Sequence, residues 1–319
     1  METDKTRHSV SSALRWPGRQ IRRLTYRQGF LVVARKLPFA NFLRKGYQWL
    51  AGGTHNILRV NWGAHELLFL VHSPDEYRRI EADIFRLERY FLEALMAELK
   101  DGDVFLDVGS DRGVFVVPQS KAVGKNGLII AFEPRSKTFG YMEANVKLNG
   151  LTNVRLFKAA LGDEQGRFRL WCDGATPSLL HVPTEGLLDP SLSSSSTASG
   201  ISEWADVYVG DRIIEREHLP APTAVKIDVE GFEYRVIRGL KRTLGNPACK
   251  MLCFEIHPYV LADGITPQVL IDEVKSLGFG EVTSIRRGSE LQVIARKGQR
   301  DTSAGAVPKP TTDRGAIRN

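Results

Sequence analysis

Cysteine is scarce in this chain of 319 residues, which holds only Cys172, Cys249 and Cys253. An odd and small number of cysteines argues against a disulfide framework. Cys249 and Cys253 stand four positions apart on an expected strand, roughly 13 Å from each other, which is too far for a disulfide bond. We therefore expect a reducing, cytoplasmic setting for this chain.

Long apolar runs are missing as well. No run reaches the roughly 18 apolar residues that a membrane-spanning helix needs, so we expect no membrane span. Arginines recur throughout residues 1–50, and the unbroken apolar core of a signal peptide is therefore absent there.

Negative charge is almost absent from residues 1–50, which hold eleven Lys or Arg against Glu2 and Asp4. This excess of +9 exceeds the net charge of +7 of the whole chain, so residues 51–319 sum to −2. Two interpretations of this basic arm stay open: a solvated, partly helical segment, or a surface that contacts an anionic membrane or an acidic substrate. Zinc-ligand spacing and basic–aromatic interleaving are both missing, and we expect no nucleic-acid partner.

The patterns divide the chain into three parts. Residues 1–72 hold the basic arm and a short β-hairpin, which alternating apolar residues around a glycine-containing turn predict over 56–71. Residues 73–297 form the main domain, and it begins with one amphipathic helix or two in tandem, capped by Ser73. Residues 298–319 have no periodicity and are expected to be disordered.

From Val104 onward, strand and helix patterns alternate, which is typical of an α/β fold with a parallel sheet. We expect strands at 104–108, 128–132, 154–161, 166–171, 207–209, 224–229 and 250–256, and helices at 113–123, 136–149, 232–244 and 266–277. Pro118 implies a kink or a late start of the first of these helices. The chain closes with a hairpin of strands 282–286 and 291–295, one of which must run antiparallel to the other.

Residues 173–203 interrupt the alternation of strand and helix patterns, because they are rich in Ser, Gly and Pro and include four consecutive serines at 193–196. This composition predicts a mobile segment. It is either a solvent-exposed loop or a lid over an acceptor site, a role that long loops in compact domains often have.

The first strand of this alternation ends in Asp107, and a glycine-containing loop with Gly109, Ser110, Asp111 and Gly113 follows. The G-x-G-x-x-G fingerprint of dinucleotide sites lacks its middle glycine here, and Asp111 would repel a phosphate. A zwitterionic cofactor without phosphate fits this loop better. We interpret it as the cofactor loop of a methyltransferase that uses S-adenosylmethionine, with Asp107 and Asp111 binding the amino group directly or through water.

Two further strand ends supply candidate contacts to the rest of such a cofactor. Glu133 ends the second strand, and a carboxylate there can accept both hydroxyls of a ribose. Ala160 and Leu161 end the third strand, where their backbone would lie beside an adenine ring.

Acidic residues and a histidine gather at the ends of the last two parallel strands. Asp228 ends one strand beside the expected sulfonium, and Glu230 and Glu233 follow it. These acids can hold a hydroxyl nucleophile or act as its base, or they can stabilise the N-terminus of the next helix. His257, after Glu255 on the next strand, is a candidate base near neutral pH or a structural histidine before a proline. We predict no metal ligands.

Six motifs together resemble the FkbM family of methyltransferases over about residues 86–296. They are Asp-Val-Gly-x-x-x-Gly (107–113), Ile-Ala-Phe-Glu-Pro (130–134), Asn-Gly-Leu-x-Asn-Val (149–154), Ala-Leu-Gly-Asp (160–163), Lys-Ile-Asp-Val-Glu-Gly (226–231) and Phe-Glu-Ile-His (254–257). The family has Gly-Ala-Asn where this chain has Gly109-Ser110-Asp111.

The resemblance implies an α/β, Rossmann-like sheet of seven mostly parallel strands with the C-terminal antiparallel hairpin and helices on both faces. It implies S-adenosylmethionine as the methyl donor and a hydroxyl acceptor on a sugar or polyketide. The family's cofactor roles fall on Gly109, Gly113 and Glu133, and an active-site role falls on Asp228.

The sequence therefore predicts an O-methyltransferase for a hydroxyl of a sugar, glycan or polyketide-like small molecule. Its predicted catalytic residues are Asp228, Glu230 and His257. A binding or scaffold protein on a degenerate methyltransferase fold is the alternative. The missing glycine and the terminal hairpin argue against an NAD-dependent dehydrogenase. The sequence does not indicate an oligomeric state.

Overall fold

The computed structural model describes residues 56–63, 65–172, 177–180, 201–261 and 264–298. The basic arm of residues 1–50, the serine run at 193–196 and the tail after residue 298 lie outside these ranges, and the predictions made for them stay predictions. The described residues from Ile57 onward belong to one compact unit, and the domain bounds drawn from the sequence stay a prediction.

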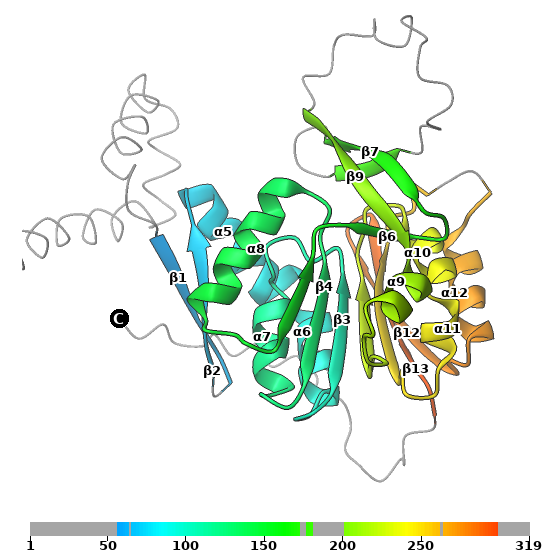
Figure 1. Cartoon of the computed structure of the whole chain (residues 1–319), viewed down its shortest axis with the longest axis horizontal. Helices are drawn as coiled ribbons and strands as arrows, with labels where there is room; N and C mark the ends of the chain where they lie inside the picture. Colours follow the sequence, from blue (N-terminus) through cyan, green and yellow to red (C-terminus); the bar gives the residue numbers. More distant parts are fainter. Residues whose placement is uncertain (1–55, 64, 173–176, 181–200, 262–263, 299–319) are drawn as a thin grey trace, which may run out of the picture. The chain divides into compact units, whose positions relative to one another are not determined.

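Seven strands form the central sheet in the order β12-β13-β11-β10-β3-β4-β5 (Figure 1). Their bounds are Val104–Val108 for β3, Leu128–Phe132 for β4, Val154–Phe157 for β5, Ala224–Ile227 for β10, Met251–Ile256 for β11, Glu281–Arg287 for β12 and Glu290–Arg296 for β13. Strand β13 runs antiparallel to both of its neighbours, β11 and β12, whereas β3, β4, β5, β10 and β11 are parallel to one another. The predicted Rossmann-like architecture with its terminal hairpin is confirmed.

Side chains alternate across each strand, so both faces of the sheet carry apolar residues, and helices cover both faces. In β3, Leu106 and Val108 enter one hydrophobic core and Phe105 enters the other. The first core includes side chains of α9 (Gly210–Arg216), α10 (Glu233–Gly239), α11 (Lys241–Gly245) and α12 (Pro267–Ser276). The second includes side chains of α5 (Pro74–Ala82), α6 (Arg89–Glu98), α7 (Val116–Ala122) and α8 (Ser136–Leu148). Each fully buried Leu, Val or Phe contributes about 1.5–3 kcal/mol to folding.

A capping serine and a proline set the starts of the helices before and after β3. Ser73 caps α5 by accepting a hydrogen bond from the Glu76 N–H at 3.1 Å. A π-helical turn, η1 (Asp83–Leu87), separates α5 from α6, so the tandem-helix prediction holds with an irregular junction. Helix α7 begins only at Val116, which places Pro118 in the first turn, where its missing N–H costs no helical hydrogen bond.

Two predicted elements are divided in the structure. The prediction of a single strand at 154–161 is wrong, because the structure has two strands there. Strand β5 ends at Phe157, and β6 (Ala160–Gly162) joins a second sheet of order β6-β9-β7-β8. The helix expected at 232–244 splits at Leu240, because the Asp211 carboxylate accepts hydrogen bonds from the N–H groups of Arg242 and Thr243 and starts α11 anew.

The second sheet also corrects the prediction for residues 173–203. Its other strands are β7 (Gly166–Cys172), β8 (Pro177–Leu180) and β9 (Ile201–Val209). Parts of the expected loop are therefore strand, since β8 and the start of β9 both pair with β7.

The N-terminal hairpin packs onto helix α8. Its strands are β1 (Asn56–Trp62) and β2 (His65–Val71). The side-chain oxygens of Asn149 and Asn145 accept hydrogen bonds from the N–H groups of Leu68 and Leu70. These amides satisfy the free edge of β2, which would otherwise offer itself to another strand. Among the residues described, none of the helices combines the length and apolar character needed to span a bilayer.

Candidate active site

A cavity of about 610 Å³ opens at the carboxyl ends of β3, β4, β10 and β11. Open α/β sheets bind their ligands at this edge, and the volume lies within the roughly 300–1,000 Å³ of small-molecule sites. Eight of the predicted site residues line it: Gly109, Ser110, Asp111, Glu133, Ala160, Leu161, Asp228 and Glu230. The cofactor and acceptor halves that we inferred from separate motifs therefore share one cavity.

The loop after β3 brings backbone close to the neighbouring strand. Gly109 has φ +80°, and a Cβ at this position would overlap the carbonyl oxygen of Asp228. Only glycine fits here, because it tolerates positive φ and needs no side-chain space. The Ser110 hydroxyl donates to the carbonyl oxygen of Asp107 at 3.0 Å and closes the turn.

Glu133, 5% exposed, fixes the loop across the cavity floor. Its carboxylate accepts hydrogen bonds from the N–H of Asp111 at 2.8 Å, the N–H of Arg135 at 2.9 Å and the Thr138 hydroxyl at 2.8 Å. Burial raises the pKa of Glu133 to about 7, and the nearby charge of Asp111 adds to the rise. Three of the roughly four acceptor positions of the carboxylate are thus occupied. One remains for a ligand hydroxyl, and the contact of Glu133 with both hydroxyls of a ribose stays a prediction.

Backbone strain gathers at this cavity. Asp111 and Glu230 have φ values of +46° and +54°, and both line the cavity. Among the residues described, His218 is the only other non-glycine residue with positive φ. Strained residues of this kind persist where the surrounding structure holds them, and they cluster at functional sites.

An apolar wall closes the side of the cavity next to Glu133. Ala160 and Leu161 belong to β6, which leaves the central sheet after β5 ends, and they line the cavity with Phe132 and Leu170. The break that divides the predicted strand at 154–161 therefore places these two residues at the cavity. This wall is suited to a flat aromatic ring.

Two predicted cofactor residues, Asp107 and Gly113, do not line the cavity. The Asp107 carboxylate is fully buried, and its Oδ1 lies 3.4 Å from Nζ of Lys226. Gly113 has φ +83°, and an added Cβ would lie 3.3 Å from Cγ of Met142 on α8. Both residues support the loop from behind, and the contact of Asp107 with an amino group, direct or through water, stays a prediction.

Lys226, which we did not predict, connects the two halves of the site. It is 2% exposed, and Nζ donates to the carbonyl oxygen of Gly109 at 2.8 Å and lies 3.6 Å from Oδ2 of Asp228. Burial alone would lower the pKa of this ammonium, but the Asp107 and Asp228 carboxylates outweigh it and raise the pKa. A lysine inside an otherwise apolar strand was the available signal, because lysine is almost never buried without a partner.

His257 lies directly behind the acidic residues that line the cavity. Its Nδ1 is 2.8 Å from Oε1 of the fully buried Glu233, and its Nε2 is 3.2 Å from Oε2 of Glu230. Burial favours the neutral ring, but Glu233, Asp228 and Glu230 together raise the pKa of His257 to about 10. As an imidazolium it has no free site for a proton, which argues against the predicted role as a base near neutral pH.

A second network reaches the cavity from distant parts of the sequence. Arg287, the last residue of β12, donates from Nε and Nη2 to the two oxygens of Glu255 at 3.0 and 2.7 Å. It also donates to Glu88 at 3.3 Å. Burial and the charge of Asp228 raise the pKa of Glu88 to about 7 and that of Glu255 to about 8. No local pattern connects residues 88, 255 and 287, so this network could not be predicted from the sequence.

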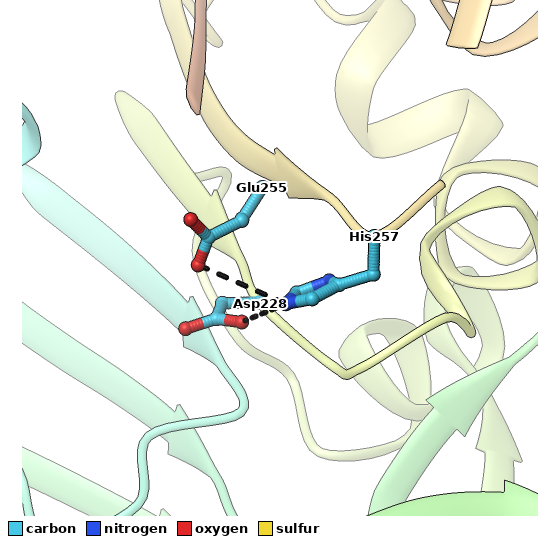
Figure 2. Close-up of side chains that lie close together, drawn as sticks. All are labelled: Asp228, Glu255 and His257. Atoms are coloured by element: carbon cyan, nitrogen blue, oxygen red, sulfur yellow. Dashed lines mark ion pairs between the residues drawn. The ribbon is translucent and has the colours of Figure 1, made fainter. Parts of the chain in front are cut away.

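The ends of β10 and β11 bring three potential metal ligands together, although we predicted none. Figure 2 shows the side chains of Asp228, Glu255 and His257 converging on one point. Nε2 of His257 lies 3.9 Å from Oδ1 of Asp228 and 3.9 Å from Oε2 of Glu255. One ligand atom from each residue lies within 4.8 Å of the others, close enough to share a cation.

Known methyltransferases resemble this chain in sequence. The hexuronic acid methyltransferase AglP of Haloferax volcanii is 29% identical over 253 residues, which cover 78% of this chain and 94% of that protein. The 31-O-demethyl-FK506 methyltransferase FkbM of Streptomyces tacrolimicus is 27% identical over 220 residues, 63% of this chain and 76% of that protein.

Among solved structures, methyltransferase FkbM from Methylobacillus flagellatus KT superposes with a TM-score of 0.45 at 14% identity. The alignment covers 70% of this chain and half of that chain. The sequence profile of the Methyltransferase FkbM domain matches residues 107–279, more than half of the chain. This match includes the loop after β3 and the ends of β10 and β11. The chain belongs to the FkbM family of methyltransferases.

Proposed function

We propose that this methyltransferase methylates a hydroxyl oxygen of a sugar, a glycan or a polyketide-like small molecule. S-adenosylmethionine is its methyl donor. One observation carries the proposal: Glu133 and the pair Asp228 and Glu230 line the same cavity. A ribose-binding carboxylate and hydroxyl-binding carboxylates therefore lie within reach of one bound donor and one acceptor.

The residues of the cofactor half fit the donor. Glu133 has one acceptor position left for a ribose hydroxyl, and Leu161 and Phe132 offer an apolar wall for the adenine. The Asp111 carboxylate suits the ammonium group of the amino-acid end. The loop after β3 lacks the middle glycine of a phosphate-binding run, in agreement with a donor that carries no phosphate.

The acceptor half can hold a hydroxyl and receive its proton. When bound, the donor supplies a methyl group on a positively charged sulfur, which leaves as a neutral thioether. Asp228 would orient the acceptor hydroxyl, and Glu230 would take its proton as the new oxygen–carbon bond forms and the carbon–sulfur bond breaks.

The surroundings of Glu230 suit this role as a base. Burial raises the pKa of Glu230 to about 7, the carboxylates of Asp228 and Glu233 add to the rise, and His257 opposes it. A general base works best when its pKa lies near the operating pH, because it is then both deprotonated and basic enough to accept a proton. Glu230 therefore matches a proton transfer at neutral pH better than His257 does.

Alignment of donor and acceptor would supply most of the rate. Holding two reactants in a productive geometry can remove about 7–11 kcal/mol from a barrier. The rigid strand ends, the Lys226 contact to Gly109 and the strained backbone of Asp111 and Glu230 all favour such preorganisation.

The names of two relatives support an oxygen acceptor on a sugar or a similar small molecule. One is named for a hexuronic acid, which is a sugar acid, and the other for 31-O-demethyl-FK506, a name that places the methyl group on an oxygen. The acceptor half of the cavity contains Asp83, Glu88, Arg287, Ser289 and Glu290. So many polar groups suit a polyhydroxylated sugar better than an apolar ring.

A donor-binding and product experiment tests the proposal. We expect calorimetry to detect S-adenosylhomocysteine binding by the wild type and at least about tenfold weaker binding by Glu133→Ala. With S-adenosylmethionine and a panel of hexuronic acids, neutral sugars and glycans, mass spectrometry should detect one added CH2 on a hydroxyl. Methylation of nitrogen or carbon acceptors alone would contradict the proposal.

A further inference from the structure

The three converging side chains of Figure 2 have the spacing of a metal site. Two ligands on opposite sides of one cation, with bonds of roughly 2.1 Å each, stand about 4.2 Å apart. The distances from Nε2 of His257 to Oδ1 of Asp228 and Oε2 of Glu255 are both 3.9 Å, within this limit. All three ligand atoms lie within 4.8 Å of one another, so a small side-chain rotation brings the third pair, Asp228 and Glu255, within the limit as well. These contacts are too long for hydrogen bonds, so the atoms face one another across a small gap.

Each of the three side chains is held from outside the gap. Glu233, which is fully buried, contacts Nδ1 of His257 at 2.8 Å and directs Nε2 toward the two carboxylates. Arg287 holds both oxygens of Glu255, and Nζ of Lys226 lies 3.6 Å from Oδ2 of Asp228. A carboxylate behind a ligating histidine and hydrogen-bonded ligating carboxylates are the usual surroundings of protein metal sites.

The local charge also favours a cation. Among the residues described, Lys226 and Arg287 are the basic groups beside this cluster that keep their charge when a metal ion binds, because the ion replaces the Nε2 proton of the His257 imidazolium. The carboxylates around them are more numerous: Glu88, Asp107, Asp228, Glu230, Glu233 and Glu255. Buried charges need compensation by opposite charge, and a divalent cation would supply what the basic groups leave uncompensated.

We propose that Asp228, Glu255 and His257 bind one divalent cation at the acceptor end of the cavity, and that Mn²⁺ fits this site. A set of one imidazole and two carboxylates suits a first-row cation that accepts both nitrogen and oxygen ligands. Mg²⁺ favours oxygen ligands and keeps several waters, so it matches this set less well. Asp228 and Glu255 line the cavity, and the open coordination positions would therefore face the acceptor.

The role of this cation rests on the proposed function. A hydroxyl bound to a divalent cation loses its proton more easily. Glu230, whose Oε2 lies 3.2 Å from Nε2 of His257, borders the site and would accept that proton. The oxygen then forms its bond to the methyl carbon, the carbon–sulfur bond breaks, and its electron pair stays on sulfur in S-adenosylhomocysteine.

Mn²⁺ binding by the EDTA-treated, dialysed full-length protein tests the site without any acceptor. We expect electron paramagnetic resonance of free Mn²⁺ to detect one saturable site in the wild type. Glu255→Gln and Asp228→Asn should each weaken Mn²⁺ binding by at least about tenfold. Glu290→Gln is the matched control, since Glu290 lines the same cavity and pairs with the same Arg287 but lies outside the three ligands.

Retention of Mn²⁺ affinity by Glu290→Gln would show that the effect comes from the ligands and not from cavity charge. Circular dichroism must show that the variants are folded. Two ligand variants are used so that the test still holds if one of them does not fold. Absence of saturable binding in the wild type, or equal weakening by Glu290→Gln, would overturn the metal site.

Measurements of methylation in EDTA and in Mn²⁺ test the metal site and the proposed function separately. If the chain methylates a sugar hydroxyl equally well in EDTA and in Mn²⁺, the catalytic role of the cation is wrong and the proposed function stands. If Mn²⁺ binds as described but no hydroxyl acceptor is methylated, the metal site stands and the proposed function is wrong. If EDTA abolishes methylation and Mn²⁺ restores it, both are supported.

Discussion

The ammonium of Lys226 donates a hydrogen bond to the carbonyl oxygen of Gly109 at 2.8 Å and thereby joins strand β10 to the loop after β3. The same nitrogen lies 3.4 Å from Asp107 and 3.6 Å from Asp228. One buried cation thus compensates the charge of Asp107 beneath the proposed donor loop and holds Asp228 at the proposed acceptor end. The two halves of the cavity depend on each other through this side chain.

Replacing Lys226 with methionine should destabilise the protein strongly. The substitution keeps an unbranched apolar stem but leaves Asp107, which is fully buried, without its partner. Breaking a buried pair in this way costs about 3–5 kcal/mol. Urea denaturation measures the free energy of unfolding, and Lys250→Met, at an exposed position, is the control with an expected change within about 0.5 kcal/mol. Equal stability of the two variants would contradict the role of Lys226.

Gly109→Ala should abolish donor binding. The new Cβ would overlap the carbonyl oxygen of Asp228, and the positive φ adds strain of about 1–2 kcal/mol. Gly150→Ala is the matched control, because Gly150 has φ +62° but nothing within 4 Å of an added Cβ. We expect both variants to lose some stability and only Gly109→Ala to lose S-adenosylhomocysteine binding in calorimetry. Undiminished binding by Gly109→Ala would show that the loop does not contact the donor.

The sequence predicted the parts of the site that follow from local chemistry. Gly109, Glu133 and Asp228 each directly follow a buried strand, and parallel strands place such residues at one edge of the sheet. The buried lysine was also readable in principle, because Lys226 interrupts a strand of apolar residues. The mostly parallel sheet and the terminal hairpin followed from the alternation of patterns and the family resemblance.

The rest depends on contacts between residues far apart in the chain. Arg287 meets Glu88 across 199 positions and Glu255 across 32, and nothing in the local sequence fixes these pairs. The break between β5 and β6 is likewise set by pairing of β6 with β9, which comes about forty residues later. His257 looked like a base because an unperturbed imidazole titrates near neutral pH, whereas its surroundings raise its pKa to about 10.

Donor affinity should rise with pH through about 7. Burial raises the pKa of Glu133 to about 7, so the carboxylate loses its proton only above that pH in the free protein. Only the ionised form offers its remaining oxygen lone pair to a ribose hydroxyl while it accepts the three protein hydrogen bonds. We expect S-adenosylhomocysteine to bind more tightly at about pH 8 than at about pH 6. Glu133→Gln should remove this difference, and a pH dependence that persists in Glu133→Gln would assign it to another group.

Stability should fall as the pH rises from about 4.5 to about 7 in the protein without ligands. Burial raises the pKa of Asp83 to about 6 and that of Glu88 and Glu133 to about 7. A carboxyl with a raised folded-state pKa holds its proton more tightly when folded, so the folded state binds more protons across this interval and loses stability as the pH rises. Urea denaturation at a series of pH values measures the slope, and Glu133→Gln should flatten it. A free energy of unfolding that increases over this interval would contradict these shifts.

Glu230→Gln should lower kcat with little change in donor affinity. Glu230 lines the cavity at the acceptor end, and its glutamine variant keeps the size of the side chain but cannot accept a proton. Loss of general base catalysis costs a factor of about 10² to 10⁴ in rate. The matched control is Glu164→Gln, which removes an exposed carboxylate paired with Arg235 and should leave kcat unchanged. Steady-state kinetics with the sugar acceptor and calorimetry with S-adenosylhomocysteine measure the two quantities separately. A kcat of Glu230→Gln equal to that of Glu164→Gln would mean that the hydroxyl proton leaves by another route, whereas a loss confined to donor affinity would move Glu230 into the cofactor half of the cavity.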